Sequence, residues 1–122
     1  MEASSLATGI DAALVDAALE IARLPDLTTD LLALIEGALL LVCGRDGVVS
    51  VRTVQAEAQD RFTAERLETL FFALTQAGAL IRLQRDRRGH TFDQYRVEPD
   101  RLHQTIHDAT VARHVLQQVQ AE

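Results

Sequence analysis

The chain has 122 residues, of which 48% are hydrophobic, 25% are charged and 4% are aromatic. This composition is typical of one compact domain with its own hydrophobic core, and it excludes a disordered tail and a disulfide-stabilised mini-protein. The formal net charge of −6 argues against a protein that binds nucleic acid through overall basic charge.

The cysteine count and the apolar segments indicate the compartment. The single cysteine, Cys43, cannot form a disulfide within the chain, and residues 1–30 lack the basic start and apolar middle of an export signal. The longest apolar stretch, residues 31–43, is interrupted by Glu36 and Gly37 and is shorter than the ~20 residues that a bilayer span requires. We therefore expect a cytoplasmic protein without a membrane segment, in which Cys43 is a small core residue.

Charge is distributed unevenly along the chain. Residues 1–60 contain three arginines against ten acidic residues, residues 61–101 contain eight against six, and residues 102–122 contain one against two. The net positive charge therefore lies in the middle segment. Every basic residue other than histidine is an arginine. Arginine suits bidentate phosphate contacts, but a GC-rich genome produces the same bias, and we favour that compositional explanation.

The first part of the chain predicts two helices. Apolar residues such as Ile10, Leu14 and Ile21 recur at helical spacing over residues 10–24, and Pro25 ends this amphipathic helix. Residues 1–6 are expected to be frayed. A second helix should begin at an N-cap, Thr28 or Thr29, and run to residue 43. Because its leucines occupy nearly all sides, we expect this helix in the middle of the fold.

The middle of the chain predicts a turn, a short strand and two helices. Residues 44–47 form the turn and residues 48–49 the strand, and Ser50 caps a brief helix that ends near residue 58. Thr63 caps a longer helix whose apolar residues repeat at i, i+3, i+4 and i+7, and Gly78 ends it as a C′ glycine.

The last part predicts a β-hairpin and a closing helix. Residues 79–84 and 91–97 alternate as strands around the polar connection 85–90. Pro99 suits the first turn of a helix that extends to about residue 119. The inner face of this helix is expected to contain Leu102, Ile106, Ala109 and Leu116.

This order of elements resembles the winged helix-turn-helix superfamily over residues 28–97. The residues that carry the resemblance are Val48-Val49-Ser50, Val54-Gln55-Ala56-Glu57, Thr63-Ala64-Glu65-Arg66-Leu67, Leu70, Leu74, Ala77-Gly78-Ala79-Leu80-Ile81 and an arginine-rich hairpin that returns through Tyr95-Arg96-Val97. It implies a mainly α fold with a small β-hairpin. The winged helix-turn-helix core, residues 28–97, would be flanked by an N-terminal amphipathic helix in residues 1–27 and by a C-terminal helix in residues 98–122.

The resemblance implies a small transcriptional regulator that binds duplex DNA. In DNA-binding members of the superfamily, the longer helix enters the major groove and the hairpin contacts the backbone or the minor groove. Carried over by position, Thr63, Arg66 and Thr69 would face bases. The hairpin would bring Arg82, Arg85, Arg87, Arg88 and His90 to phosphates, where they supply affinity and little sequence preference.

The alternative is a winged-helix module that binds protein, as an adaptor or a subunit of a larger complex. Glu65 and Glu68 lie on the surface that would approach DNA, where an unpaired carboxylate repels phosphates, although a glutamate can accept a hydrogen bond from cytosine. Phe72 lies outside the apolar stripe of its helix. We expect it to be covered by a terminal helix rather than exposed.

The flanking helices predict self-association, because they exceed what a winged core needs and small dimeric regulators of this fold often pair through such helices. Two-fold pairing also lets two weak DNA contacts add their energies. The candidate dimerisation residues are Ile10, Leu14 and Ile21 in the first helix and Leu102, Ile106 and Leu116 in the last. Alternatively, the two apolar stripes pack on each other within one chain and leave a monomer.

The closing helix also carries Asp100, His103, His107 and His114 on one side. Asp100, His103 and His107 could bind zinc, which is similar to the arsenic-repressor family of dimeric metal sensors, but the ligand spacing differs and that family's cysteine motif is absent. A pH-sensitive histidine cluster at a dimer seam is an alternative. We expect no metal or other cofactor. We also expect no enzyme, because the sequence lacks a Gly-rich phosphate loop and a supported nucleophile arrangement.

Overall fold

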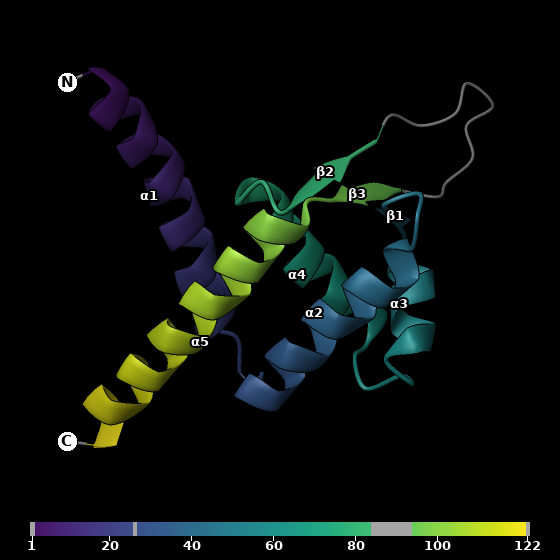
Figure 1. Ribbon diagram of the computed structural model, residues 1–122. Coiled ribbons are helices and arrows are strands. Elements are labelled where there is room, and N and C mark those ends of the chain that lie inside the picture. Colours follow the sequence, from purple (N-terminus) through teal and green to yellow (C-terminus); the bar gives the residue numbers. More distant parts are fainter. Residues whose placement is uncertain (1, 26, 84–93, 122) are drawn as a thin grey trace.

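The computed structural model describes residues 2–25, 27–83 and 94–121, with side chains from residue 12 to residue 119 within those ranges. The elements in chain order are α1 (Glu2–Ala22), α2 (Thr29–Cys43), β1 (Val48–Val49), α3 (Val51–Glu57), α4 (Ala64–Gln76), β2 (Leu80–Arg82), β3 (Tyr95–Val97) and α5 (Pro99–Ala121) (Figure 1). The prediction of a mainly helical chain with a small β portion is confirmed.

Side-chain caps explain where three of the helices begin. Thr28 Oγ1 accepts a hydrogen bond from the Leu31 amide at the start of α2. Ser50 Oγ accepts from the Thr53 amide at 3.2 Å, and Thr53 Oγ1 accepts in return from the Ser50 amide at 3.1 Å, which forms a capping box on α3. Thr63 caps α4 in the same way as Thr28 caps α2. The predicted caps are confirmed, because each satisfies an amide that the helix itself leaves without a partner.

The end of α4 leads directly into the sheet. Gly78 has φ +80°, a left-handed conformation that favours glycine, and it stands at the predicted C′ position. The three strands form an antiparallel sheet in the order β1-β3-β2. Leu80 pairs with Val97 and both are buried, whereas Ile81 pairs with Arg96 and both are exposed. The sheet therefore has one face on the core and one in solvent.

The described parts of the two predicted hairpin strands pair with each other. Pairing covers residues 80–82 and 95–97, and the Leu83 amide also donates to the Gln94 carbonyl oxygen at 2.9 Å. The predicted hairpin tip, with Arg85, Arg87, Arg88 and His90, lies outside the described residues.

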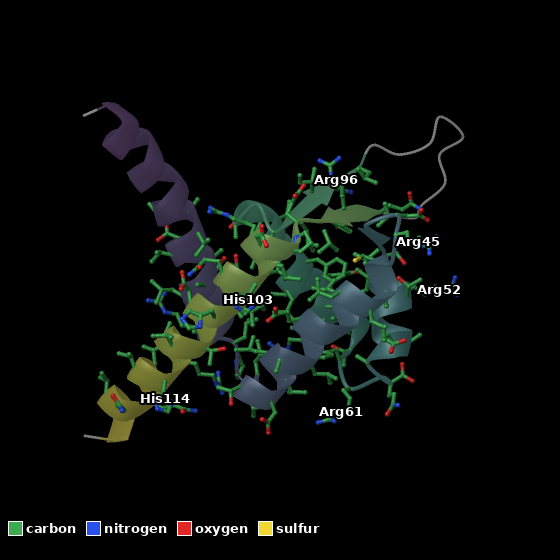
Figure 2. All side chains as sticks on the ribbon, viewed as in Figure 1. Arg45, Arg52, Arg61, Arg96, His103 and His114 are labelled. Atoms are coloured by element: carbon green, nitrogen blue, oxygen red, sulfur yellow. The ribbon has the colours of Figure 1, made fainter. Side chains whose placement is uncertain are left out.

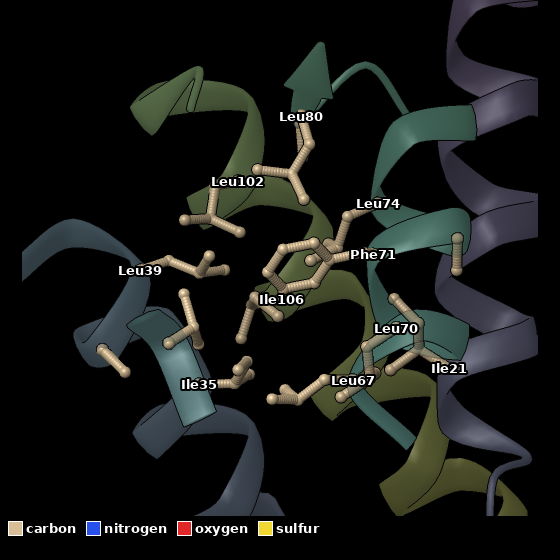
Figure 3. Close-up of a cluster of buried hydrophobic side chains, with 14 of the residues drawn as sticks. Ile21, Ile35, Leu39, Leu67, Leu70, Phe71, Leu74, Leu80, Leu102 and Ile106 are labelled. Atoms are coloured by element: carbon tan, nitrogen blue, oxygen red, sulfur yellow. The ribbon is translucent and has the colours of Figure 1, made fainter. Parts of the chain in front are cut away.

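The core lies between α4 and the surrounding helices (Figure 3). The Phe71 ring meets the Tyr95 ring edge to face, with centroids 5.1 Å apart and an interplanar angle of 88°. Leu67, Leu70 and Leu74 of α4 are fully buried with it. They share one cluster with Ile21 of α1, Ile35 and Leu39 of α2, and Leu102 and Ile106 of α5. Cys43 also belongs to this cluster, as predicted.

The position of α2 differs from the prediction. Its inner face, including Leu32 and Ile35, is buried, but Leu41 is 67% exposed. The prediction of a central helix is wrong, because α2 packs on the core through one face and its other face meets solvent. Among the helices of the described chain, none combines the length and the apolar content needed to cross a membrane.

The terminal helices cross and pack on each other within one chain (Figure 1). The backbone of α1 is helical from Glu2, so residues 2–6 belong to the helix and not to the frayed segment that the sequence predicts. Leu14 and Ile21 of α1 and Leu102 and Ile106 of α5 are buried inside the molecule. These four residues are therefore not a free surface for a second copy, which corrects the predicted dimerisation surface. Leu116 is half-buried, and the side chain of Ile10 lies outside the described ones.

Candidate nucleic-acid interface

The N-terminal half of α4 brings together the three residues predicted to face bases. Thr63, Arg66 and Thr69 line a hollow of 270 Å³ together with Glu65. Thr63 Oγ1 accepts from the Arg66 amide, and Thr69 Oγ1 donates to the Glu65 carbonyl oxygen at 3.1 Å. The Thr63 hydroxyl can still donate and the Thr69 hydroxyl can still accept. The hollow is thus polar, with one guanidinium and one carboxylate.

The outer stripe of α4 continues with acidic and aromatic residues. Glu65, Glu68 and Phe72 lie at a spacing of three or four residues and all three are exposed. The Phe72 side chain is 63% exposed, so the prediction that a terminal helix covers it is wrong. Helix α1 packs against α4 and α5 packs against α1 and α2, and neither terminal helix covers the face of α4 that carries Phe72.

A second group of charged residues lies before and after α3. Arg45 stands in the turn before β1, Arg52 in the first turn of α3 and Arg61 in the connection to α4, and all three are exposed. Figure 2 shows Arg45 and Arg52 where β1 meets α3, away from the crossing of α1 and α5. Within the described part of the chain, these three guanidinium groups have no ion pair or hydrogen bond.

Sequence reasoning did not single out Arg45 and Arg52. Both belong to residues 1–60, whose summed charge is negative, so counting charge by segment concealed them. Their exposed positions at the two ends of β1 depend on the fold. The only available signal was the glycine-containing turn that places Arg45 at the surface.

The arginines of α5 donate hydrogen bonds to backbone carbonyl oxygens within the chain. Arg101 Nε donates to the Ala77 carbonyl oxygen at 2.7 Å, and Arg113 Nη1 donates to the Ala22 and Leu24 carbonyl oxygens. These groups hold the ends of α4 and α1 in place. The exposed arginines around α3 are therefore distinct from the structural arginines of α5.

The sheet contributes two further arginines. Arg82 is exposed and pairs in register with Tyr95. Arg96 Nε lies 3.4 Å from Glu98 Oε1, and both side chains are about half exposed. An exposed ion pair of this kind is weak and does not prevent a competing contact with phosphate.

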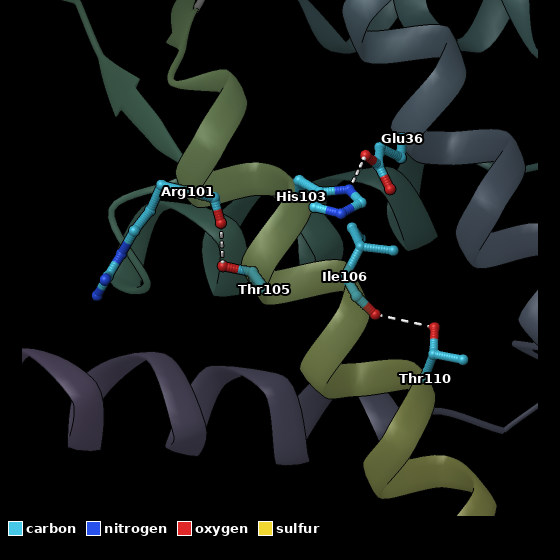
Figure 4. A network of polar contacts seen from close by, with 6 residues as sticks. All are labelled: Glu36, Arg101, His103, Thr105, Ile106 and Thr110. Atoms are coloured by element: carbon cyan, nitrogen blue, oxygen red, sulfur yellow. Dashed lines mark hydrogen bonds and ion pairs between the residues drawn. The ribbon is translucent and has the colours of Figure 1, made fainter.

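The histidine face of α5 is not assembled as a metal site. His103 Nδ1 lies 2.9 Å from Glu36 Oε2 of α2, with His103 74% exposed and Glu36 19% exposed (Figure 4). Asp100, His107 and His114 are exposed along the same helix. Among the described side chains, no group of three His, Cys, Asp or Glu residues is placed to hold a metal ion. Sequence reasoning missed Glu36 as the partner of His103.

Thr105, the fully buried polar residue among the described side chains of α5, needs no ligand either. Thr105 is buried, and its Oγ1 donates to the Arg101 carbonyl oxygen at 2.7 Å. Thr110 Oγ1 donates in the same way to the Ile106 carbonyl oxygen at 2.9 Å (Figure 4). Both hydroxyls are satisfied within their own helix.

Comparison of the chain with protein-family models, with curated proteins and with solved structures found no match. The function is therefore inferred from the chain's own residues.

Proposed function

We propose that this chain is a winged-helix protein that binds duplex DNA. The order α2, β1, α3, α4, β2, β3 is the order that the resemblance implies for the core, with α1 and α5 as the flanking helices. On this proposal α3 and α4 are the helix-turn-helix pair, and the paired strands β2 and β3 belong to the wing.

The unpaired arginines around α3 carry the proposal. Arg45, Arg52 and Arg61 are exposed, and none has a carboxylate partner within the described residues. A guanidinium in water without an intramolecular partner can bind phosphate bidentately without first breaking an ion pair. The chain is acidic overall, and exposed carboxylates at Asp46, Glu57 and Asp60 neighbour these arginines in sequence, so the proposal rests on the guanidinium groups themselves and not on a local excess of positive charge.

The contacts on this proposal are mainly to the DNA backbone. Phosphate contacts from Arg45 and Arg52 would supply affinity and a strong salt dependence. Base contacts would come from the polar hollow on α4, where Arg66 is the one side chain suited to a bidentate contact with guanine. Because Glu65 stands beside it, we propose a regulator whose sequence preference is modest compared with its backbone affinity.

Fluorescence anisotropy on a mixed-sequence duplex over a range of salt concentrations tests the proposal. We expect the affinity to fall steeply with salt, and the double variant Arg45→Ala/Arg52→Ala to reduce the log–log slope by about 2, about 1 for each lost phosphate contact. Arg23→Ala is the matched control, since Arg23 is an exposed arginine at the end of α1. No binding at low salt, or an unchanged slope in the double variant, would overturn the proposal.

The arginines between β2 and β3 give a second test. The triple variant Arg85→Ala/Arg87→Ala/Arg88→Ala should weaken binding to every duplex sequence alike, because phosphate contacts carry little sequence information. Unchanged affinity would remove this connection from the DNA interface.

The second candidate function is a protein-interaction module, which the exposed Phe72 favours. A large aromatic side chain between Glu68 and Gln76 on an outer helical stripe is typical of a protein contact rather than of a phosphate contact. This candidate predicts no salt-dependent DNA binding. It also predicts that Phe72→Ala, rather than Arg45→Ala/Arg52→Ala, removes binding to a partner.

A further inference from the structure

An apolar surface remains where α1 and α5 cross, although the residues predicted for dimerisation are buried. Val111 and Val115 of α5 are 49% and 52% exposed, and Val15 of α1 is 46% exposed. A groove of 400 Å³ runs between the two helices at this point. It is lined by Val15, Ala18, Leu19, His107, Asp108, Val111 and Ala112. The core beneath α5 ends near Ala109, so the next turns of the helix have an uncovered outer face.

Charged and polar groups flank the valines asymmetrically. At about 100° per residue, His107 lies about 40° to one side of Val111 and Asp108 about 60° to the other side. The two differ in height by about 1.5 Å along the helix. Asp108 Oδ1 accepts from Gln104 Nε2 at 2.9 Å, and its second carboxylate oxygen has no hydrogen bond within the described residues.

We propose that this face binds a second copy of the chain, with the two α5 helices side by side and parallel about a two-fold axis. A parallel two-fold pair places one flank of each helix against the opposite flank of the other, at the same height. Asp108 of each copy then faces His107 of the other, and Val111 meets Val111 at the axis. An imidazole donates a hydrogen bond to a carboxylate in either protonation state.

The charges favour the parallel pairing over the antiparallel one. An antiparallel two-fold pair centred on Val111 places like flanks together, so that His107 faces the second copy's His114 and Asp108 faces its Val115. That arrangement opposes two imidazoles and sets a carboxylate against an apolar side chain. The Asp108–His107 pair is therefore matched in the parallel orientation and not in the antiparallel one, which is why a second copy is the occupant that we propose.

The mass of the full chain in solution gives the first test. Sedimentation equilibrium at micromolar concentrations should return twice the 13.4 kDa chain mass. Val111→Asp should raise the dimer dissociation constant at least ~10-fold, because it places two carboxylates at the axis. Leu41→Asp, at an exposed leucine of α2, is the matched control and should leave the dimer intact. A monomer mass at about 1 mM, or a dimer that Val111→Asp leaves unchanged, would overturn the proposal.

Charge variants test the orientation. His107→Asp should weaken a parallel dimer, since it opposes two carboxylates, and the double variant His107→Asp/Asp108→His should restore it by exchanging the flanks. In an antiparallel dimer His107→Asp would instead face His114 and strengthen the association. Tighter association of the single variant would therefore overturn the parallel arrangement. His107 is exposed, and the circular dichroism of each variant checks that the fold is retained.

Cysteine cross-linking measures the register directly. In the parallel pair both Val111→Cys and Gln118→Cys should form a disulfide between copies under mild oxidation, because each position meets itself. In an antiparallel pair centred on Val111, the two copies of residue 118 are separated by ~21 Å along the axis and cannot be joined. A cross-link at residue 111 alone would overturn the proposal. The unsubstituted chain is the control. Its Cys43 is buried in the core, so it should form no disulfide between copies.

Discussion

Arg113 of α5 donates a hydrogen bond from Nη1 to the carbonyl oxygen of Ala22, the last residue of α1, at 3.1 Å. The same nitrogen lies 3.2 Å from the Leu24 carbonyl oxygen. The last carbonyl groups of a helix have no partner within that helix, and a cation near them is favourable. One side chain thus joins the end of the first helix to the middle of the last.

Replacement of Arg113 should destabilise the fold. We expect Arg113→Ala to lower the free energy of unfolding by about 1–3 kcal/mol, because it leaves the last carbonyl groups of α1 without this donor. Urea denaturation followed by circular dichroism measures the change. Arg23→Ala is the control and should change the free energy by less than about 0.5 kcal/mol, since Arg23 is exposed. Equal effects of the two substitutions would contradict the assignment of Arg113 as a structural residue.

Truncation of the two adjacent phenylalanines of α4 should cost very different amounts of stability. Phe71 is fully buried against Tyr95, so Phe71→Ala should cost about 3–5 kcal/mol of unfolding free energy. Phe72 is largely exposed, so Phe72→Ala should cost less than about 0.5 kcal/mol. Urea midpoints at constant m-value measure both. A large loss of stability in Phe72→Ala would show that another element covers this residue.

Two glycines form a matched pair with opposite expected signs. Gly78 has φ +80°, and a Cβ there would meet the Arg101 side chain at ordinary contact distance, so the backbone conformation is the main obstacle. Gly78→Ala should cost about 1 kcal/mol or more. Gly37 lies inside α2, and a methyl group added at its Cα would have no neighbouring atom within 4 Å. Gly37→Ala should therefore stabilise the chain by about 0.5–1 kcal/mol, and thermal denaturation resolves the two signs.

The acidic residues of α4 test the DNA proposal independently of the arginines. Glu65→Gln/Glu68→Gln removes two negative charges from the face that would approach phosphates, so duplex affinity at low salt should rise by roughly two- to tenfold. Glu20→Gln, at an exposed position of α1, is the control and should leave the duplex affinity unchanged. If the double variant binds DNA no more tightly, α4 does not face the duplex, and the protein-interaction candidate gains support.

Local structure could be predicted well from the sequence because its signals are local. Ser50, Thr63 and Gly78 act on amides and carbonyls within a few residues of themselves, so their roles follow from spacing alone. The same holds for Pro99, which begins α5 as predicted. The grouping of Thr63, Arg66 and Thr69 in one hollow also follows from helical periodicity.

Contacts between distant elements could not be predicted, because an amphipathic stripe specifies that a face is buried and not what buries it. Leu14 and Ile106 have the spacing that a dimer interface would also need, yet they are buried within one chain. The sequence predicts that a terminal helix covers Phe72, but α1 and α5 leave this side chain exposed. The contact of His103 with Glu36 joins residues 67 positions apart, and no local pattern indicates it.

The crossing of the two terminal helices has a consequence for how the chain is made. Translation runs from α1 towards α5, so Arg113, whose side chain donates to the end of α1, emerges after α1, α2, α3 and α4. Until then, the apolar side of α1 lacks its final cover. Helix α1 is therefore fully covered only after α5 has emerged, and chains truncated before α5 should expose the apolar side of α1.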